Sequence, residues 1–146
     1  MLSRTADHLY WMSRYIERAE NLARMLQVNV RSSLLPQHAD GADRGWAGTL
    51  AIIGQLEAYR ERGGMVASDR VVRFLAFDDS NPGSIVQNLY LARENAPCIR
   101  DQITSDAWEQ LNRLYLQMRG KTVADYRQTG TVEFLVDPSR DFAHFL

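Results

Sequence analysis

The feature of the sequence that most constrains its fold is a long apolar stripe near the N-terminus. Apolar residues recur there at steps of three and four, the spacing that places side chains on one face of an α-helix. The stripe consists of Leu9, Met12, Ile16, Ala19, Ala23, Leu26 and Val30. Pro36 disfavours a helical conformation at Leu35, so the helix should end within "SSLLPQ". The stripe predicts one helix of about seven turns, at ~3.6 residues per turn.

Further segments show the same helical spacing, and glycine, proline and polar clusters separate them. The predicted elements are a helix over 46–62, a short amphipathic segment over 68–78 capped by Ser68, a helix over 84–103 capped by Ser84, and a helix from Thr104 or Ser105 to 118. For 68–78, the β-branched residues leave a strand as the lesser alternative. Pro97 should kink or break the third of these. No strand alternation of any length is visible. We therefore predict an all-α bundle of four to five helices over residues 1–120, followed by a poorly patterned segment over 121–146.

Composition narrows the classes of partner. With a net charge of -1 at pH 7, the chain has no overall field that would attract nucleic acid or an anionic membrane. The uncharged stretch 45–56 is too short to span a bilayer. A single cysteine, Cys98, excludes an intramolecular disulfide and fits a reducing compartment. We expect a cytoplasmic protein without nucleic-acid or membrane partners.

The first helix is unusual because it is charged on the side away from its apolar stripe. On a helical wheel at ~100° per residue, the face opposite the stripe contains Tyr10, Trp11, Arg14, Arg18 and Asn21. Glu17 lies on the flank of this face, and Glu20 lies at the border of the stripe. Three interpretations remain open. The charges form an exposed ladder of salt bridges, or a buried polar network in a helix covered on both faces, or a ligand site. In the last case the arginines bind a carboxylate or phosphate and Glu17 acts as a base.

Other motifs in the sequence give only weak evidence for a metal, phosphate-binding or catalytic site. No Glu-x-x-His pair of the kind that holds metals in helical bundles occurs, and Gly-Lys-Thr at 120–122 lacks the rest of a phosphate-binding loop, so we predict neither a metal nor a cofactor. Cys98 is expected to be a buried, inert thiol. The tryptophans Trp11, Trp46 and Trp108 are expected to anchor the core. Asn88, Arg93 and Glu94 are candidates to meet the polar network of the first helix, and Arg93 and Glu94 could form a salt-bridged contact with its charges.

Several blocks of the sequence resemble the bacterial alpha-E domain family, an all-helical family named for a Glu-Arg motif. The N-terminal match rests on Arg14, Glu17, Arg18, Ala19, Glu20 and Asn21, and it continues through "FLAFDDSNPGSI", "LARENA", "IRDQIT" and "WEQLNRLYL". Pro97 departs from the family, which usually continues with a helix former at that place. Family members are also about twice as long and contain a second helix of this type, so the chain resembles an N-terminal half.

The resemblance implies a functional setting. Members of the family lie beside genes for an ATP-grasp-type protein and a transglutaminase-like protein, which implies a system that makes or modifies amide or peptide bonds. We expect an accessory domain that docks the ATP-grasp-type partner, with Arg14, Glu17 and Arg18 as its central residues. One alternative is an enzyme that binds a carboxylate or phosphate through Arg14 and Arg18, with Glu17 as base. A second is a self-associating scaffold, which would form a homo-oligomer.

Overall fold

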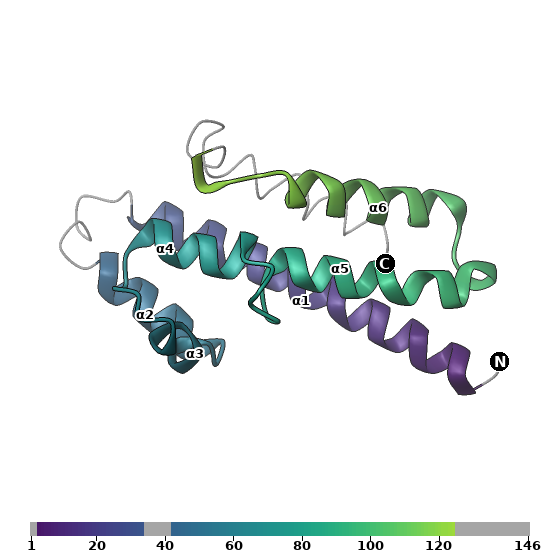
Figure 1. The fold of residues 1–146 in the computed structure, drawn as a ribbon, viewed down its shortest axis with the longest axis horizontal. Helices are drawn as coiled ribbons and strands as arrows, with labels where there is room; N and C mark the ends of the chain where they lie inside the picture. Colours follow the sequence, from purple (N-terminus) through teal and green to yellow (C-terminus); the bar gives the residue numbers. More distant parts are fainter. Residues whose placement is uncertain (1–2, 34–41, 125–146) are drawn as a thin grey trace.

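The computed structural model describes residues 3–33 and 42–124, and this part of the chain contains six α-helices, two irregular helical segments and no strand (Figure 1). In chain order the elements are α1 (Ser3–Ser33), α2 (Ala42–Ile52), α3 (Leu56–Glu61), α4 (Ser68–Val72), the π-helix η2 (Arg73–Phe77), α5 (Ile85–Asn95), the 3-10 segment η3 (Ala96–Gln102) and α6 (Ser105–Arg119). The predicted all-α fold class is confirmed. Most of the segment 121–146, predicted as poorly patterned, lies outside the described residues.

The layers follow from the way α1, α5 and α6 pack. Helices α1 and α5 run side by side along the length of the molecule, and α6 packs on α5 (Figure 1). Helices α2 and α3 lie together at one end. A hydrogen bond of 2.9 Å between His8 Nδ1 and Asn95 Oδ1 joins α1 to the end of α5. Helix α5 is therefore the element that holds the other two long helices together.

The predicted apolar stripe of α1 forms one wall of the core. Met12, Ile16, Ala19, Ala23 and Leu26 are buried, and Leu9 packs against the core from its edge. The same core contains fully buried side chains of later elements, among them Leu50, Leu75, Ile85, Leu89, Leu111 and Leu114. Burial of one such side chain stabilises the fold by roughly 1.5–3 kcal/mol, so the stripe explains why α1 belongs to the bundle.

The segment predicted as one helix over 46–62 is divided at Gly54, which corrects that prediction. Gly54 has a φ of 74°, in the left-handed region. The amide of Gln55 donates to the carbonyl of Leu50 at 2.8 Å, and the amide of Gly54 donates to that of Ala51 at 3.1 Å. This pattern ends α2 with a left-handed glycine cap, and α3 starts in a new direction at Leu56. The predicted stop at Gly63 is observed, with a φ of 72°.

Pro97 breaks the helix predicted over 84–103, as expected. Helix α5 ends at Asn95, the chain continues as the 3-10 segment η3, and Ile99 leaves helical geometry with a φ of -131°. Cys98 lies in η3 and is exposed. The expectation that Cys98 is a buried thiol was therefore wrong.

Two of the predicted helix caps are confirmed. The Ser84 hydroxyl accepts a hydrogen bond from the amide of Gln87 at 3.2 Å, and the Thr104 hydroxyl accepts one from the amide of Ala107 at 3.1 Å. The prediction for Ser68 was wrong, because Ala67 is the N-cap of α4 and offers no side-chain oxygen. Serine or threonine stabilises a helix start only where the backbone at that residue is extended, as it is at Ser84 and Thr104.

The loop between η2 and α5 is fixed by a buried asparagine. Asn81 is 2% exposed, and its side-chain amide donates to the carbonyl of Phe74 in η2 at 2.9 Å. Its side-chain oxygen accepts from the amide of Gly83 at 3.0 Å. A π-helix leaves carbonyls without the partners of a regular α-helix, and the Asn81 amide supplies one at Phe74. The loop 78–84 is thereby held against the bundle.

No helix in the described ranges combines the length and apolarity needed to cross a membrane.

Candidate functional site

Arg14 and Glu17 form an exposed ion pair on α1. Arg14 Nη1 lies 3.0 Å from Glu17 Oε2, and the two side chains are 40% and 50% exposed. A pair of this kind, three residues apart on a helix surface, contributes about 0–1 kcal/mol. For these two residues the structure supports the first interpretation, an exposed ladder of salt bridges.

Glu20 has a different environment from Glu17. It is 7% exposed, and its Oε1 accepts a hydrogen bond of 2.5 Å from Nη2 of Arg24, whose side chain is 60% exposed. A hydrogen bond between charged groups is stronger than a neutral one. Glu20 therefore lies at the edge of the core, where the wheel places it, and Arg24 extends from solvent to neutralise it.

The outer face of α1 carries a cluster that we call the aromatic–arginine face: Tyr10, Trp11, Arg14, Tyr15 and Arg18, of which Tyr15 is partly buried against the core. The Tyr10 and Trp11 rings are edge to face with centroids 5.3 Å apart, and the Trp11 and Tyr15 centroids are 5.8 Å apart. The Arg18 guanidinium lies 5.9 Å from the centroid of the Tyr15 ring. Tyr10 is 56% and Trp11 is 37% exposed.

This exposure corrects two expectations. The part of the second face that carries Tyr10, Trp11 and Arg14 is not covered by the described residues, and Arg14 and Glu17 are exposed, so these charges do not form a buried polar network. Trp11 is not a core anchor, whereas Trp46 is 1% exposed and is one. Trp108 is partly buried against the core. The wheel separates the two faces of α1 correctly, but it does not tell whether another helix covers the second face.

Next to this face lies a cavity of about 320 Å³, which we call the Arg18 cavity. Its lining comes from three parts of the chain: Arg18, Asn21, Leu22 and Met25 of α1, Ile53 and Gln55 around the turn after α2, and Pro82, Gly83 and Asn88 from the loop 78–84 and α5. Its volume falls in the range of ~300–1,000 Å³ that is usual for small-molecule sites. The "ERAEN" and "SNPGSI" blocks, far apart in sequence, therefore meet at one cavity.

The polar groups of the Arg18 cavity are arranged by tight local packing. Asn88 is 3% exposed, and its side-chain amide donates to the carbonyls of Ser84 at 2.8 Å and Gly83 at 3.2 Å. A Cβ atom on Gly83 would lie 2.3 Å from Nε2 of Gln55, so only glycine lets the Gln55 amide lie this close to the loop. Arg18 forms no ion pair within the described chain. Among the described residues, the cavity presents the guanidinium of Arg18, the side-chain amides of Asn21, Gln55 and Asn88, and apolar walls.

The structure brings together some of the predicted site residues and not others. Arg18 and Asn21 line the cavity, but Arg14 and Glu17 do not. The Arg93 guanidinium lies 4.8 Å from the centroid of the Tyr115 ring of α6, and Glu94 is exposed. The predicted salt-bridged contact of Arg93 and Glu94 with α1 is absent among residues 3–33 and 42–124.

Sequence reasoning named Asn88 as a possible neighbour of the first helix, and Asn88 does line the cavity with Arg18 and Asn21. It did not identify Gln55, Pro82 and Gly83 as site residues. The "NPGS" turn was a visible signal, but it was interpreted only as a turn and helix cap. The contact between Gln55 and Gly83 depends on the break at Gly54, which the sequence analysis missed. In the described part of the chain no three side chains of the metal-binding types lie together.

The fold and the site together define a class of protein. It is an all-helical domain whose longest helix presents a Glu-Arg pair beside a polar cavity. The chain belongs to the Alpha-E family, described as a predicted alpha-helical domain with a conserved ER motif, which matches residues 1–145. Glu17 and Arg18 are the Glu-Arg pair on which the resemblance rests.

Two mycobacterial relatives are similar to this chain. Uncharacterized protein Rv2567 of Mycobacterium tuberculosis and uncharacterized protein Mb2597 of Mycobacterium bovis are each 31% identical to it over 117 residues. The similarity covers 72% of this chain but only 13% of each relative, so the chain spans a small part of their length. No solved structure matches.

Proposed function

We propose that this chain is a helical accessory domain of an amide-bond-forming or peptide-modifying system, and that it docks an ATP-grasp-type partner through the aromatic–arginine face of α1. The observation that carries the proposal is the exposure of Tyr10 and Trp11 beside Arg18 on the longest helix. Tryptophan, tyrosine and arginine are the residue types enriched among the energetically dominant contacts of protein interfaces.

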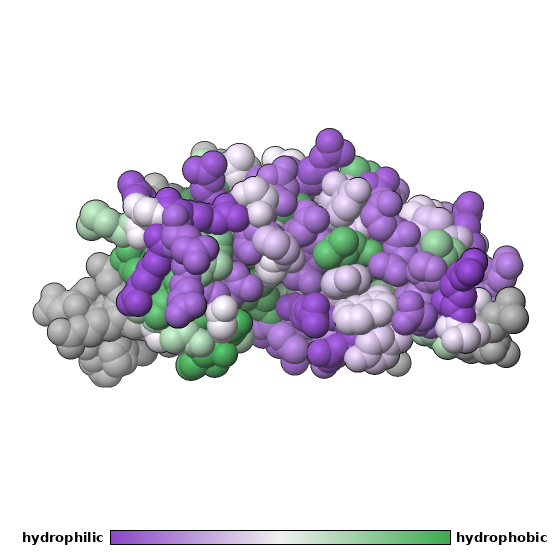
Figure 2. All heavy atoms as spheres, turned by 60° about the horizontal axis from the view of Figure 1, so that its bottom comes forward, coloured by the Kyte–Doolittle hydropathy of each residue, from purple (hydrophilic) through white to green (hydrophobic). Residues whose placement is uncertain are grey.

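The surroundings of this face suit an interface of mixed polarity. The opposite side of α1 is anchored in the core by Met12 and Ile16, so the helix presents its aromatic side chains from a rigid base. On the face of the molecule shown in Figure 2, hydrophilic side chains predominate and apolar ones form small, separate patches, the larger of them toward the end with α2 and α3. Non-obligate interfaces have about this mixture, with aromatic residues and arginine at their centre.

Binding to the purified ATP-grasp-type protein, measured by isothermal titration calorimetry, tests the proposal. We expect Trp11→Ala and Arg18→Ala each to weaken binding by about 30-fold, which corresponds to ~2 kcal/mol for a dominant contact. Leu116→Ala is the matched control, because Leu116 is 50% exposed on α6 and away from this face. Undiminished affinity in both α1 variants would overturn the proposal. The transglutaminase-like protein serves as a second candidate partner in the same assay.

The Arg18 cavity favours a second candidate function, an enzyme domain that binds a carboxylate or phosphate. In this alternative Arg18 binds the anion. Glu17 is paired with Arg14 and does not line the cavity, so it would have to move in order to act as a base. Gly83→Ala separates the alternatives, because it displaces the flexible Gln55 amide inside the cavity and leaves the aromatic–arginine face unchanged. Loss of ligand binding with intact partner binding would favour the enzyme.

A self-associating scaffold is the remaining alternative. Large exposed apolar patches mark surfaces that associate, and the face in Figure 2 carries only small ones. Sedimentation velocity over a range of concentrations measures this directly, and a concentration-dependent dimer would favour the scaffold.

A further inference from the structure

We propose that a second cavity, between α3 and the continuous helical segment α4–η2, binds a phosphate monoester through Arg70 and Arg73. The cavity has a volume of about 500 Å³ and shares no lining residue with the Arg18 cavity. Among the described residues, three arginines line it, Arg62, Arg70 and Arg73, and the one acidic residue in this lining is Asp78. The lining is therefore positive although the chain as a whole has a net charge of -1.

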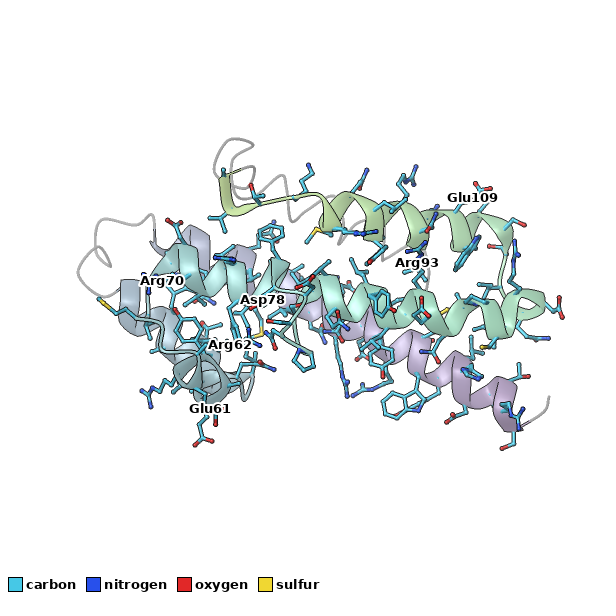
Figure 3. The ribbon with its side chains drawn as sticks, in the orientation of Figure 1. Glu61, Arg62, Arg70, Asp78, Arg93 and Glu109 are labelled. Atoms are coloured by element: carbon cyan, nitrogen blue, oxygen red, sulfur yellow. The ribbon has the colours of Figure 1, made fainter. Side chains whose placement is uncertain are left out.

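The charge of Arg62 is already balanced within the protein. Its guanidinium donates from Nη1 to Asp78 Oδ2 and to Ser80 Oγ, each at 2.7 Å, and from Nη2 to the Ser80 carbonyl at 2.9 Å. The other oxygen of Asp78 accepts from the hydroxyl of Ser80 at 2.6 Å and from its amide at 3.0 Å. Arg62 and Asp78 thus form a rigid, neutral edge of the cavity. Figure 3 shows Glu61 pointing away from Asp78, so the neighbouring carboxylate does not add to this edge.

Among the described residues, Arg70 and Arg73 are the two arginines of this cavity that form no ion pair. They lie three residues apart across the junction of α4 and η2, a spacing that places both side chains on one side of the helix. Arg73 is the first residue of the π-helix, and its carbonyl accepts from the amide of Asp78 at 2.9 Å. Short π-helical turns occur frequently at functional sites.

The aromatic wall of the cavity, formed by Tyr59 and Phe74, is neutral. Tyr59 is buried, and its hydroxyl donates to the carbonyl of Met65. Burial raises the pKa of Tyr59 although the charge of Arg70 acts against this shift, so the ring stays uncharged at neutral pH. The Tyr59 and Phe74 rings pack edge to face with centroids 5.3 Å apart. The wall thus offers an apolar surface to the organic part of a ligand.

The number of positive charges on Arg70 and Arg73 indicates which class of ligand the cavity fits. Two such guanidinium groups match a group of two negative charges, and a phosphate monoester carries about −1.5 to −2 at pH 7. A single carboxylate would neutralise only one of them. The planar guanidinium also binds phosphate oxygens in pairs, which an ammonium group cannot do.

Titration calorimetry with glycerol 3-phosphate and with inorganic phosphate on the folded chain tests this inference. We expect Arg70→Gln and Arg73→Gln each to weaken binding at least tenfold, and Arg70→Lys to weaken it less. Arg60→Gln is the matched control, because Arg60 is an exposed arginine of α3 that does not line the cavity. It should change the dissociation constant less than twofold. Circular dichroism of the free variants verifies that each is folded.

Three outcomes would overturn the inference. One is an absence of saturable binding of either phosphate probe, and another is an equal loss of affinity in Arg60→Gln, which would indicate a general electrostatic effect. The third is unchanged affinity in Arg70→Gln and Arg73→Gln. None of these outcomes bears on partner docking, because the partner assay uses Trp11 and Arg18.

Discussion

Two glutamates of the Glu-Arg segment have different environments, and the environment determines what each side chain contributes to the protein. Glu17 and Glu20 are one helical turn apart, yet the Glu17 side chain is 50% exposed and that of Glu20 is 9% exposed. The wheel predicted their different positions, since it places Glu20 at the border of the apolar stripe. It could not predict that Arg24 pairs with Glu20, or that Arg18 lines a cavity.

We expect Glu20→Ala to lower the free energy of unfolding by about 1–2 kcal/mol, because the change removes a charge-assisted hydrogen bond at the edge of the core. Glu17→Ala is the matched control, and it should change the same free energy by no more than about 0.5 kcal/mol. Urea denaturation of the two variants measures both values. Equal losses would contradict the different roles assigned to these residues.

At the scale of elements, the sequence predicted where helices exist better than where they end. Ser84 and Thr104 were recognised as caps, and Pro97 as a break, because each acts through its own local chemistry. Gly54 was missed, because a glycine inside a helical pattern is compatible both with a continuous helix and with a left-handed cap. The break at Gly54 matters for function, since it places Gln55 against the loop 78–84.

Gly54→Ala should lower the free energy of unfolding by about 1–2 kcal/mol, the cost of holding an L-residue in the left-handed conformation. Gly48→Ala is the control within α2. A Cβ on Gly48 would meet nothing within 4 Å, so alanine should leave stability unchanged or raise it by up to about 1 kcal/mol through its higher helix propensity. Thermal unfolding followed by circular dichroism measures both changes. A stabilised Gly54→Ala variant would show that the cap does not require glycine.

At the scale of the whole molecule, the buried surface of α5 determines how the long helices pack together. Helix α5 contacts both α1 and α6, and Leu89 lies on it fully buried. A helix with neighbours on two sides has to be apolar over more of its circumference than a surface helix. The sequence predicted the apolar face of this segment, but the order in which the helices pack became visible only in the structure.

Leu89→Ala should lower the free energy of unfolding by about 2–5 kcal/mol, through lost burial and the cavity left behind. Since a domain is stable by only ~5–15 kcal/mol, the midpoint of urea denaturation should fall markedly while the transition stays single. Leu116→Ala, at a half-exposed position of α6, should leave the midpoint nearly unchanged. Separate transitions in far-UV circular dichroism and tryptophan fluorescence would contradict a single core shared by all three helices.

The sequence by itself determined the all-α class, the long first helix and its buried face, because helical periodicity, caps and breakers act over a few neighbouring residues. The tertiary structure decided the rest. It left Trp11 exposed, placed Arg18 and Asn21 beside Gly83 and Asn88, and brought Arg70 and Arg73 to the same cavity as Arg62. These arrangements depend on which helices pack together, and the free energy of packing belongs to contacts between distant segments rather than to any local pattern.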